Sequence, residues 1–600
     1  MKNFIKITRK WLPLALSTWF LAGVIACSDE FLDVPATGQV SEGQLTTQSG
    51  LEGQLIGIYA ALDGIGEAWH GGAVNWMWGS IRGGDANKGT NAGDFADMNP
   101  VERFELPPTN ILVDEKWRHS YEGVARANRL LAIMQNAETV SDDIKTRIAA
   151  EARFLRGHFY FELRKNFKMV PWIDETVDYA AGAEEIPNNT DIWPNIEVDF
   201  QFAIDNLPET QSEVGRANKW AAASYLAKVY MFQNKFNEAK VLFDDIIANG
   251  VTTNGQKYGL FPDFEELFTV ANENSAESIF AFQATGGAQN VSNSLHELAM
   301  AMPYNTAAGQ AAPSDCCGFF QPSFDIAASY RTTPAGLPLL DGSYRVGANE
   351  LKTDQGILSS APFTPDQGLL DPRIDHTLGR RGLPFLDWNV HPGYDWIRDQ
   401  SYAGPYTPMK YNLRKSEYTT RDASGWTPGY AATNFMVIRF ADVLLMAAEA
   451  EIEVGTLEKA REYVNMVRAR AAAPGTFTVA RDPADQSKEL FDANGNPVPA
   501  ANYVISTYNA PWTDQALARQ AVRFERKLEL ALEGHRFYDL VRWGIAGEVI
   551  PPYLTYEASK IPSHFSGASF TPGRDEYLPI PQRQIDLQGS DVLSQNDGFN

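Results

Sequence analysis

Two helical blocks with the same repeat spacing lie near opposite ends of this 600-residue chain, and a loop-rich middle separates them. Residues 218–251 fit the 34-residue tetratricopeptide pattern of two antiparallel helices. The fitting positions are Leu226, Ala227, Tyr230, Ala239 and Phe243. A weaker copy follows roughly two hundred residues later, at Ala447, Ala448, Ala460, Val464 and Val467, with Gly455 as its turn. An ordinary solenoid stacks its repeats in succession, so we expect the two ends to meet in space around an inserted middle.

The spacing of apolar residues predicts a mainly α-helical, tetratricopeptide-like scaffold with three regions. Residues 27–250 are expected to form an N-terminal helical region, and residues 431–600 a C-terminal helical region that packs on it. The first region contains three long predicted helices, at residues 117–134, 148–164 and 192–207. Between the two regions, residues 251–430 are rich in Gly, Pro, Asn and aromatic residues. We expect this excursion to contain loops, short helices and hairpins, and to carry the ligand-binding groups.

The first 26 residues have the features of a secretory signal peptide. Four basic residues precede an apolar stretch from Trp11 to Ile25, and Ala26 comes directly before Cys27. This ending resembles a bacterial lipobox, which implies cleavage before Cys27 and acylation of that residue. The alternative is an ordinary signal peptide with an incidental cysteine. Acidic residues after Cys27 resemble a surface-export signal, so the resemblance implies a lipoprotein anchored to the outer membrane at the cell surface.

Charge and cysteine content exclude several classes of protein. The chain has 51 basic and 75 acidic residues, and removal of the signal peptide would take its net charge from −24 to −28. Nucleic-acid binding needs a surplus of basic residues, so we expect no nucleic-acid partner. Three cysteines are too few for a disulfide scaffold or a four-cysteine zinc module. We expect no metal site and no cofactor, because the eight histidines are scattered and dinucleotide and P-loop motifs are absent.

Several segments resemble the SusD/RagB family of surface lipoproteins from glycan-uptake systems, and together they span the chain after the signal peptide. They are Cys27–Pro35, Glu151–Arg156 with Val170–Trp172, Val437–Ala450, Glu525–Gly544, and an ending at Leu578–Gln582 and Gln595–Phe599. The resemblance implies a non-catalytic, surface-exposed protein that binds oligosaccharide. It also implies a partner, a SusC-like TonB-dependent transporter in the outer membrane, through which the oligosaccharide is taken up.

Acidic residues in two of these segments are expected to be structural rather than catalytic. Glu525, Glu529 and Glu533 repeat every four residues with arginines between them, which is typical of a helix stabilised by ion pairs. Asp442 and Glu449 are interpreted as buried partners of Arg439 or Arg468. No pair of carboxylates in these segments is therefore assigned to glycoside hydrolysis.

Carbohydrate is recognised by aromatic faces and by polar groups that bond its hydroxyls, and aromatic residues make up 12% of this chain. Three regions supply candidates. The first contains Trp76, Trp78, Asp85 and Asn87, and the family resemblance places a loop of the ligand site there. If that stretch is extended, Trp76 and Trp78 share one face. The second contains Tyr304, Phe319 and Phe320, with Cys316 and Cys317 as a vicinal disulfide or as two free thiols. The third contains Trp388, Tyr394 and Trp396. Burial as loop core is the alternative for each tryptophan.

Three other functions compete with oligosaccharide binding. The same architecture in some relatives captures peptides, and an acidic surface would favour basic or neutral ones. A surface glycosidase would need paired carboxylates from distant loops, and the chain has none of the common hydrolase motifs. A helical-repeat scaffold that binds only protein partners would leave the large aromatic excursion unexplained.

Overall fold

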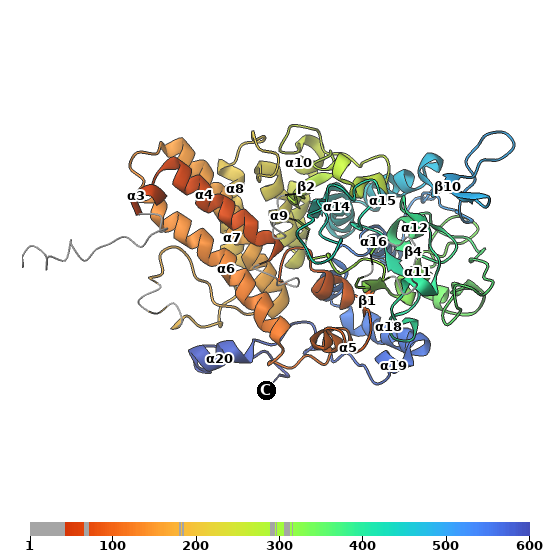
Figure 1. Ribbon diagram of the computed structural model, residues 1–600. Helices are drawn as coiled ribbons and strands as arrows, with labels where there is room; N and C mark the ends of the chain where they lie inside the picture. The colour runs from red at the N-terminus through yellow and green to blue at the C-terminus, as the bar shows by residue number, and fades with distance from the viewer. Residues whose placement is uncertain are drawn as a thin grey trace, which may run out of the picture.

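A row of helices builds the N-terminal part of the molecule in the computed structural model, which describes residues 42–64, 71–178, 182, 185–287, 294–295, 297–304, 313–314 and 316–599. The helices are α3 (Glu42–Leu45), α4 (Gln48–Tyr59), α5 (Asn99–Arg103), α6 (Ile111–Met134), α7 (Asp142–Phe167), α8 (Trp193–Asn206), α9 (Lys219–Phe232) and α10 (Phe236–Asn249). Each helix from α6 to α10 packs on the next. Figure 1 shows α4, α6, α7 and α8 side by side at one end of the molecule.

The C-terminal helices continue this packing. Strand β8 (Phe435–Arg439) runs directly into α14 (Phe440–Val454), which packs on α10 as well as on α15 and α16. The other helices here are α15 (Leu457–Ala471), α16 (Gln515–Glu529), α17 (Arg536–Arg542), α18 (Ala546–Lys560), α19 (Pro562–Phe565) and α20 (Gln582–Gln588). Helices from distant parts of the sequence therefore meet, and the predicted mainly helical fold is confirmed.

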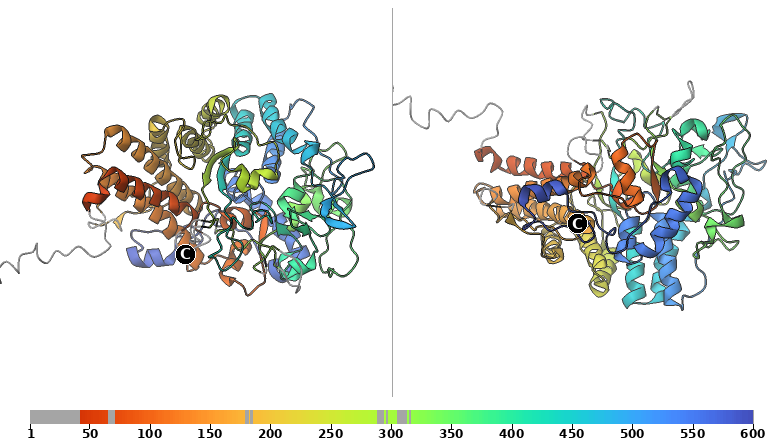
Figure 2. Two further views of the ribbon diagram at one scale, coloured as in Figure 1. Left: turned by 45° about the horizontal axis from the view of Figure 1, so that its top comes forward. Right: turned by 90° about the horizontal axis from the view of Figure 1, so that it is seen from below.

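Short elements make up the excursion between these helices, and Figure 2 shows it gathered at the end of the molecule away from α3 and α4. Its helices are α11 (Phe324–Ser329), α12 (Ile374–Thr377) and α13 (Gln400–Ala403). Its strands are β2 (Ser278–Phe282), β3 (Phe319–Pro322), β4 (Leu378–Gly379), β5 (Pro384–Phe385), β6 (Asn389–Val390) and β7 (Thr407–Pro408). Strand β1 (Ala86–Gly89) belongs to the N-terminal region, and β9 (Arg481–Asp482) and β10 (Asp485–Glu489) belong to the C-terminal region.

The strands pair two by two, and two of these pairs join the excursion to the rest of the fold. The antiparallel pairs are β1–β3, β2–β8, β4–β7, β5–β6 and β9–β10. In β2–β8, Phe280 lies opposite Ile438 just before α14 begins. In β1–β3, Asn87 lies opposite Gln321, which brings the N-terminal region into the excursion.

Local sequence explains where the central helices begin and how deeply they lie. The side chain of Asn218 accepts a hydrogen bond from the Ala221 amide at the start of α9, and Asn110 does the same for Leu112 in α6. Such caps satisfy amides that have no partner within the helix. Helix α9 is apolar around most of its circumference and is buried between its neighbours, as expected for a helix without a polar face.

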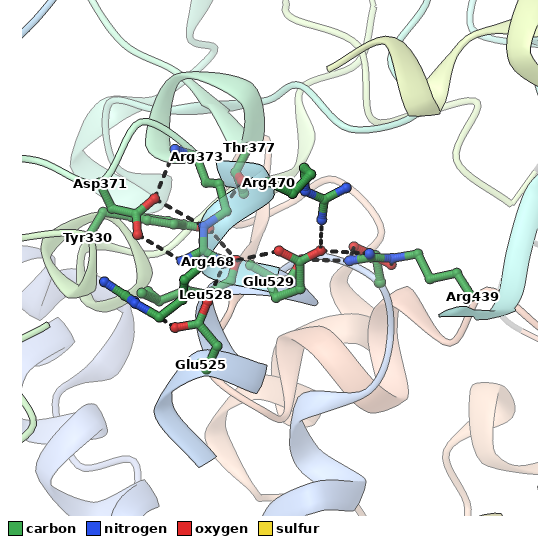
Figure 3. Close-up of polar contacts among 12 residues, drawn as sticks. Tyr330, Asp371, Arg373, Thr377, Arg439, Arg468, Arg470, Glu525, Leu528 and Glu529 are labelled. Atoms are coloured by element: carbon green, nitrogen blue, oxygen red, sulfur yellow. Dashed lines mark hydrogen bonds and ion pairs between the residues drawn. The ribbon is translucent and has the colours of Figure 1, made fainter. Parts of the chain in front are cut away.

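A buried network of ion pairs surrounds α16 (Figure 3). Arg373 of the excursion donates to Glu525 and Glu529 at 2.6 and 3.0 Å, and Arg439 at the end of β8 donates to Glu529 at 2.7 Å. Arg468 of α15 donates to Glu525 at 2.7 Å. Burial alone would raise the pKa of Glu529, but the neighbouring guanidinium groups outweigh it and hold that pKa well below its usual range. The acidic ladder of α16 therefore has a structural role.

Two predicted partners in this region are wrong. Asp442 pairs with Lys228 at 2.9 Å and with Arg526 at 2.8 Å. Glu449 pairs mainly with Arg542, through two hydrogen bonds of 2.7 Å. The reason is geometric: α14 directs Asp442 toward Lys228 of α9 and Arg526 of α16, and it directs Glu449 toward Arg542 of α17. Arg439 lies before that helix and pairs with Glu529 instead.

No helix in the described part of the chain combines the length and the apolar character needed to cross a membrane. Cys27, the predicted site of acylation, lies outside the described residues.

Candidate functional site

Trp76 and Trp78 lie in the protein core. Their side chains are 2% and 0% exposed, and the Trp76 ring meets the edge of Phe320 at 5.5 Å between centroids. The stretch is not extended: residues Trp76–Ile81 form a π-helical turn, η2, that packs against α17. A Cβ atom on Gly79 would collide with the Gly534 backbone, so glycine permits this close approach. The expectation that the two indoles stack on a ligand is wrong.

The polar candidates next to this turn are buried as well. Asn87 in β1 donates weakly to the Glu557 carboxylate at 3.4 Å and accepts from the Tyr553 hydroxyl at 3.4 Å. The amide of Leu532 donates to Asp85, and burial raises the pKa of Asp85 to about 7. Because both side chains are enclosed, the structure corrects their assignment as ligand-binding groups.

Three other predicted rings also belong to the interior. Phe319 and Phe320 lie in β3, paired with β1, and both are buried. Trp396 is 2% exposed and packs between Phe385 and His391, with centroids 5.5 and 5.2 Å away. These rings fill the space beneath the loops and present no face to a ligand. For Trp396 this agrees with the alternative interpretation, burial as loop core.

Tyr304, Trp388 and Tyr394 remain partly exposed, and Tyr304 lies in a polar setting. The guanidinium of Arg398 lies over its ring, 5.0 Å from the centroid. Arg398 also donates to the Thr90 hydroxyl at 2.9 Å and to the carboxylate of Asp94. We call Tyr304, Arg398, Thr90 and Asp94 the Tyr304 group. An aromatic face beside donors and acceptors is the combination that carbohydrate requires.

A vicinal disulfide between Cys316 and Cys317 adjoins the Tyr304 group. The next residue, Gly318, has a φ of 78°, and a Cβ atom there would lie 3.1 Å from the Cβ of Tyr304. The Gly318 carbonyl accepts from the Thr90 amide at 2.6 Å, and its own amide donates to Met302 at 2.9 Å. The backbone that follows the disulfide is thus packed directly against Tyr304.

A second aromatic group lies around Trp388. Its indole N–H donates to the Leu413 carbonyl at 2.8 Å, and its ring meets Tyr418 edge-on with centroids 6.0 Å apart. The guanidinium of Arg421 covers the Tyr418 ring at 3.7 Å. We call Trp388, Tyr418 and Arg421 the Trp388 group. Trp426, which is 57% exposed, lies nearby in sequence and meets Tyr430 at 6.5 Å.

Packing beneath the surface connects the two groups. Met302, two residues before Tyr304, shares a small apolar cluster with Leu413, and Tyr418 packs against that cluster. The Tyr304 amide donates to the Trp396 carbonyl at 3.1 Å, and Trp388 packs against the cluster that contains Trp396. Tyr394 lies in the same loop, in the short helix η10 (Tyr394–Trp396).

Sequence reasoning missed the polar members of both groups. Thr90 and Asp94 lie about 300 positions before Arg398, so their contacts could not be read from spacing. Tyr418 and Arg421 stand three residues apart, and an arginine at that distance from a tyrosine in an aromatic-rich loop was the available signal. Among the described residues, histidine, cysteine and acidic side chains form no cluster of three or more that could hold a metal ion.

Comparisons with known proteins agree on one family. A model described as "SusD family" matches residues 276–599, and one described as "Starch-binding associating with outer membrane" matches residues 94–231. SusD-like protein P2 of Formosa agariphila is 25% identical over 598 residues, covering 96% of this chain and 98% of that protein.

Solved structures share the fold across nearly the whole chain. A SusD superfamily protein from Bacteroides vulgatus gives a TM-score of 0.64 at 22% identity, covering 92% of this chain and 99% of that one. A laminarin-binding SusD-like protein gives 0.60 at 23% identity, with the same coverage. At this identity the likeness extends to the fold alone.

Proposed function

Because the chain belongs to the SusD family, whose members are non-catalytic binding proteins, we propose that it captures oligosaccharide through the Tyr304 and Trp388 groups. The bound oligosaccharide would then enter the cell through a SusC-like TonB-dependent transporter. This proposal keeps Tyr304 and Trp388 from the sequence prediction, because their rings are partly exposed, and leaves out Trp76, Trp78 and Trp396, which are buried. One of the similar solved structures is that of a laminarin-binding protein, which supports a glycan as the class of ligand.

The proposal depends mainly on the arrangement of the Tyr304 group. The Tyr304 ring is partly exposed, and Arg398 and Asp94 form an ion pair beside it. The side chains of Arg398 and Asp94 are 30% and 34% exposed. A sugar has an apolar C–H face and a rim of hydroxyls, so it can pack on the ring or guanidinium plane while its hydroxyls bond the charged pair. Because Arg398 and Asp94 neutralise each other, the group adds no net charge and suits an uncharged sugar.

The overall charge supports the same class of ligand. A mature chain of net charge −28 repels polyanions at long range, although salt weakens this effect beyond about 8 Å at physiological ionic strength. Neutral glycans are therefore favoured over sulfated or uronate-rich ones. An acidic protein is also not drawn to an anionic membrane, so attachment at the cell surface would rest on acyl chains at Cys27.

Calorimetry of the mature protein with a panel of neutral oligosaccharides tests the proposal. Tyr304→Ala and Trp388→Ala should each weaken binding by about 1–3 kcal/mol, by analogy with the stacking of bases on aromatic side chains. Tyr577→Ala is the matched control, because the Tyr577 ring, like that of Tyr304, is partly exposed and lies beside a cation. That cation is Lys168, at the end of α7. Circular dichroism and the melting temperature verify that each variant is folded.

Two outcomes would contradict the proposal. Unchanged affinity in both Tyr304→Ala and Trp388→Ala would reject these groups as the site. Binding of peptides but of no glycan in the panel would reject the ligand class. The release of reducing ends during incubation would contradict a purely binding role.

A further inference from the structure

A pocket of about 250 Å³ lies among the helices, built by elements other than those of the two aromatic groups. It is formed by the turn between α9 and α10, by α14 and α16, and by the end of α17. The residues that give it its chemical character are Phe236, Ile452, Arg519, Arg523, Arg542 and Trp543. Three guanidinium groups, those of the arginines, therefore line this one pocket.

Two of the three arginines are already neutralised. Arg519 forms two hydrogen bonds with Glu453 at 2.6 and 2.7 Å. Arg542 forms two with Glu449, both of 2.7 Å. These parallel pairs use the planar fork of arginine in its strongest geometry. Both oxygens of Glu453 and both oxygens of Glu449 are used in these pairs, so neither carboxylate can also form a two-bond pair with Arg523.

Among the described residues that line this pocket, Arg523 is the cation without an ion pair. Within the described part of the chain, its guanidinium has no hydrogen bond or ion pair and lies 5.0 Å from the centroid of the Trp543 ring. The side chain is partly buried, and burial lowers its pKa, with Arg542 and Arg519 acting in the same direction against Glu449. A partly desolvated arginine that no carboxylate bonds directly favours an anionic partner from outside the chain.

The walls of the pocket restrict what this partner can be. The Trp543 ring is fixed by its N–H bond to Glu449 at 2.9 Å, and Phe236 and Ile452 add apolar surface. A sugar hydroxyl carries no charge to pair with Arg523, and an inorganic anion would leave the apolar walls uncovered. The pocket instead fits a carboxylate joined to an apolar body.

We propose that this pocket binds the carboxylate of a peptide segment from a partner protein, with Arg523 pairing the carboxylate and Trp543 packing on the adjacent apolar side chain. The carboxylate has two possible sources, the C-terminus of the partner or a glutamate side chain within it. The site is separate from the proposed glycan site, so either can fail without the other.

Calorimetry and tryptophan fluorescence of the whole mature protein with short peptides test the proposal. The probes are acetyl-Leu-Phe with a free C-terminal carboxylate, its C-terminal amide, and acetyl-Leu-Glu-Leu-amide with its glutamine counterpart. We expect one acid to bind and its uncharged counterpart to bind at least about tenfold more weakly, the loss expected when a hydrogen bond to a charged group is removed. Whichever acid binds identifies the source of the carboxylate.

Variants at position 523 assign this binding to the pocket. Arg523→Met keeps an unbranched chain but removes the charge, and it should weaken binding of the acid by about tenfold or more. Arg523→Lys keeps the charge without the planar fork and should lie between Arg523→Met and wild type. Arg583→Gln in α20 removes one positive charge from a side chain that is 65% exposed, and it should leave binding unchanged.

Glycan calorimetry on the same Arg523→Met sample separates the two proposals, because oligosaccharide affinity should not change. Three results would overturn the peptide site: no binding of either acid by wild type, equal binding of acid and uncharged counterpart, or equal loss in Arg523→Met and Arg583→Gln.

Discussion

The region just before β1, which contains Trp76 and Trp78, and the region around Trp388 are both rich in aromatic residues. Yet the first lies in the core and the second lies partly at the surface. In the first, Trp78 is 0% exposed and belongs to a π-helical turn whose glycines allow it to approach α17 closely. In the second, Trp388 is half-buried and Tyr418 lies under the partly exposed side chain of Arg421. The difference teaches that close backbone contact, rather than ring content, decides whether an aromatic cluster can meet a ligand.

The largest difference is expected between the removal of Trp78 from the first region and the removal of Trp426, an exposed ring that follows the Trp388 group in sequence. Trp78→Ala should lower the free energy of unfolding by about 3–5 kcal/mol, because it empties a fully packed site. Trp426→Ala removes a ring that is 57% exposed and should change stability by no more than about 0.5 kcal/mol. Urea denaturation followed by circular dichroism measures both. Similar losses in the two variants would show that the assigned difference in packing is wrong.

A second test uses the buried carboxyl group of the first region. Burial raises the pKa of Asp85 to about 7, whereas an aspartate in an unfolded chain titrates near 4. Between these values the unfolded chain gives up its proton while the folded chain keeps it, so this group makes the protein less stable as the pH rises.

Asp85→Asn removes this titration and should therefore lose less stability than wild type between about pH 5 and pH 8. The two proteins should differ in that loss by about 2–3 kcal/mol. Urea denaturation at both pH values gives the result, and Asp586→Asn, an exposed position in α20, is the control. Parallel pH dependence in wild type and Asp85→Asn would mean that Asp85 is not the enclosed group described above.

The smallest expected effect concerns the partly exposed Tyr304 and the disulfide beside it. Because Gly318 packs on Tyr304 directly after the disulfide, loss of the bridge should loosen the Tyr304 group and weaken glycan binding a few-fold. The double variant Cys316→Ser, Cys317→Ser measures this by calorimetry. A phosphine reductant should have the same effect on wild type and none on the double variant. Unchanged affinity in both would show that the disulfide does not position Tyr304.

The helical scaffold could be predicted from the sequence because packed helices require apolar and small residues at a regular spacing. The small and aromatic positions of residues 218–251 became α9 and α10, and the weaker copy became α14 and α15. Their separation along the chain already required that both ends meet. The exact boundaries at residues 250 and 430 stay a prediction.

The candidate site was harder to predict because it depends on contacts between residues far apart in the sequence, and such contacts produce no regular spacing. Trp76 and Trp78 share a face only in an extended chain, and the turn there is π-helical. Arg398 reaches Thr90 and Asp94 across about 300 residues of sequence. Only burial separates Tyr304 and Trp388 from Trp396, and burial is decided by the tertiary packing of the loops.

Two buried cations fix the ends of one segment of the excursion. Arg373 is held by Glu525 and Glu529 of α16, and Lys410 is held by Glu533 at 2.7 Å just beyond that helix. The 36 residues between them, which include Trp388 and Tyr394, thus form a loop whose two ends are anchored near each other. Doubling the length of such a loop costs only about 0.6 kcal/mol in closure entropy. Insertions and deletions should therefore accumulate there during evolution, so that ligand preference can diversify while the helical frame keeps its shape.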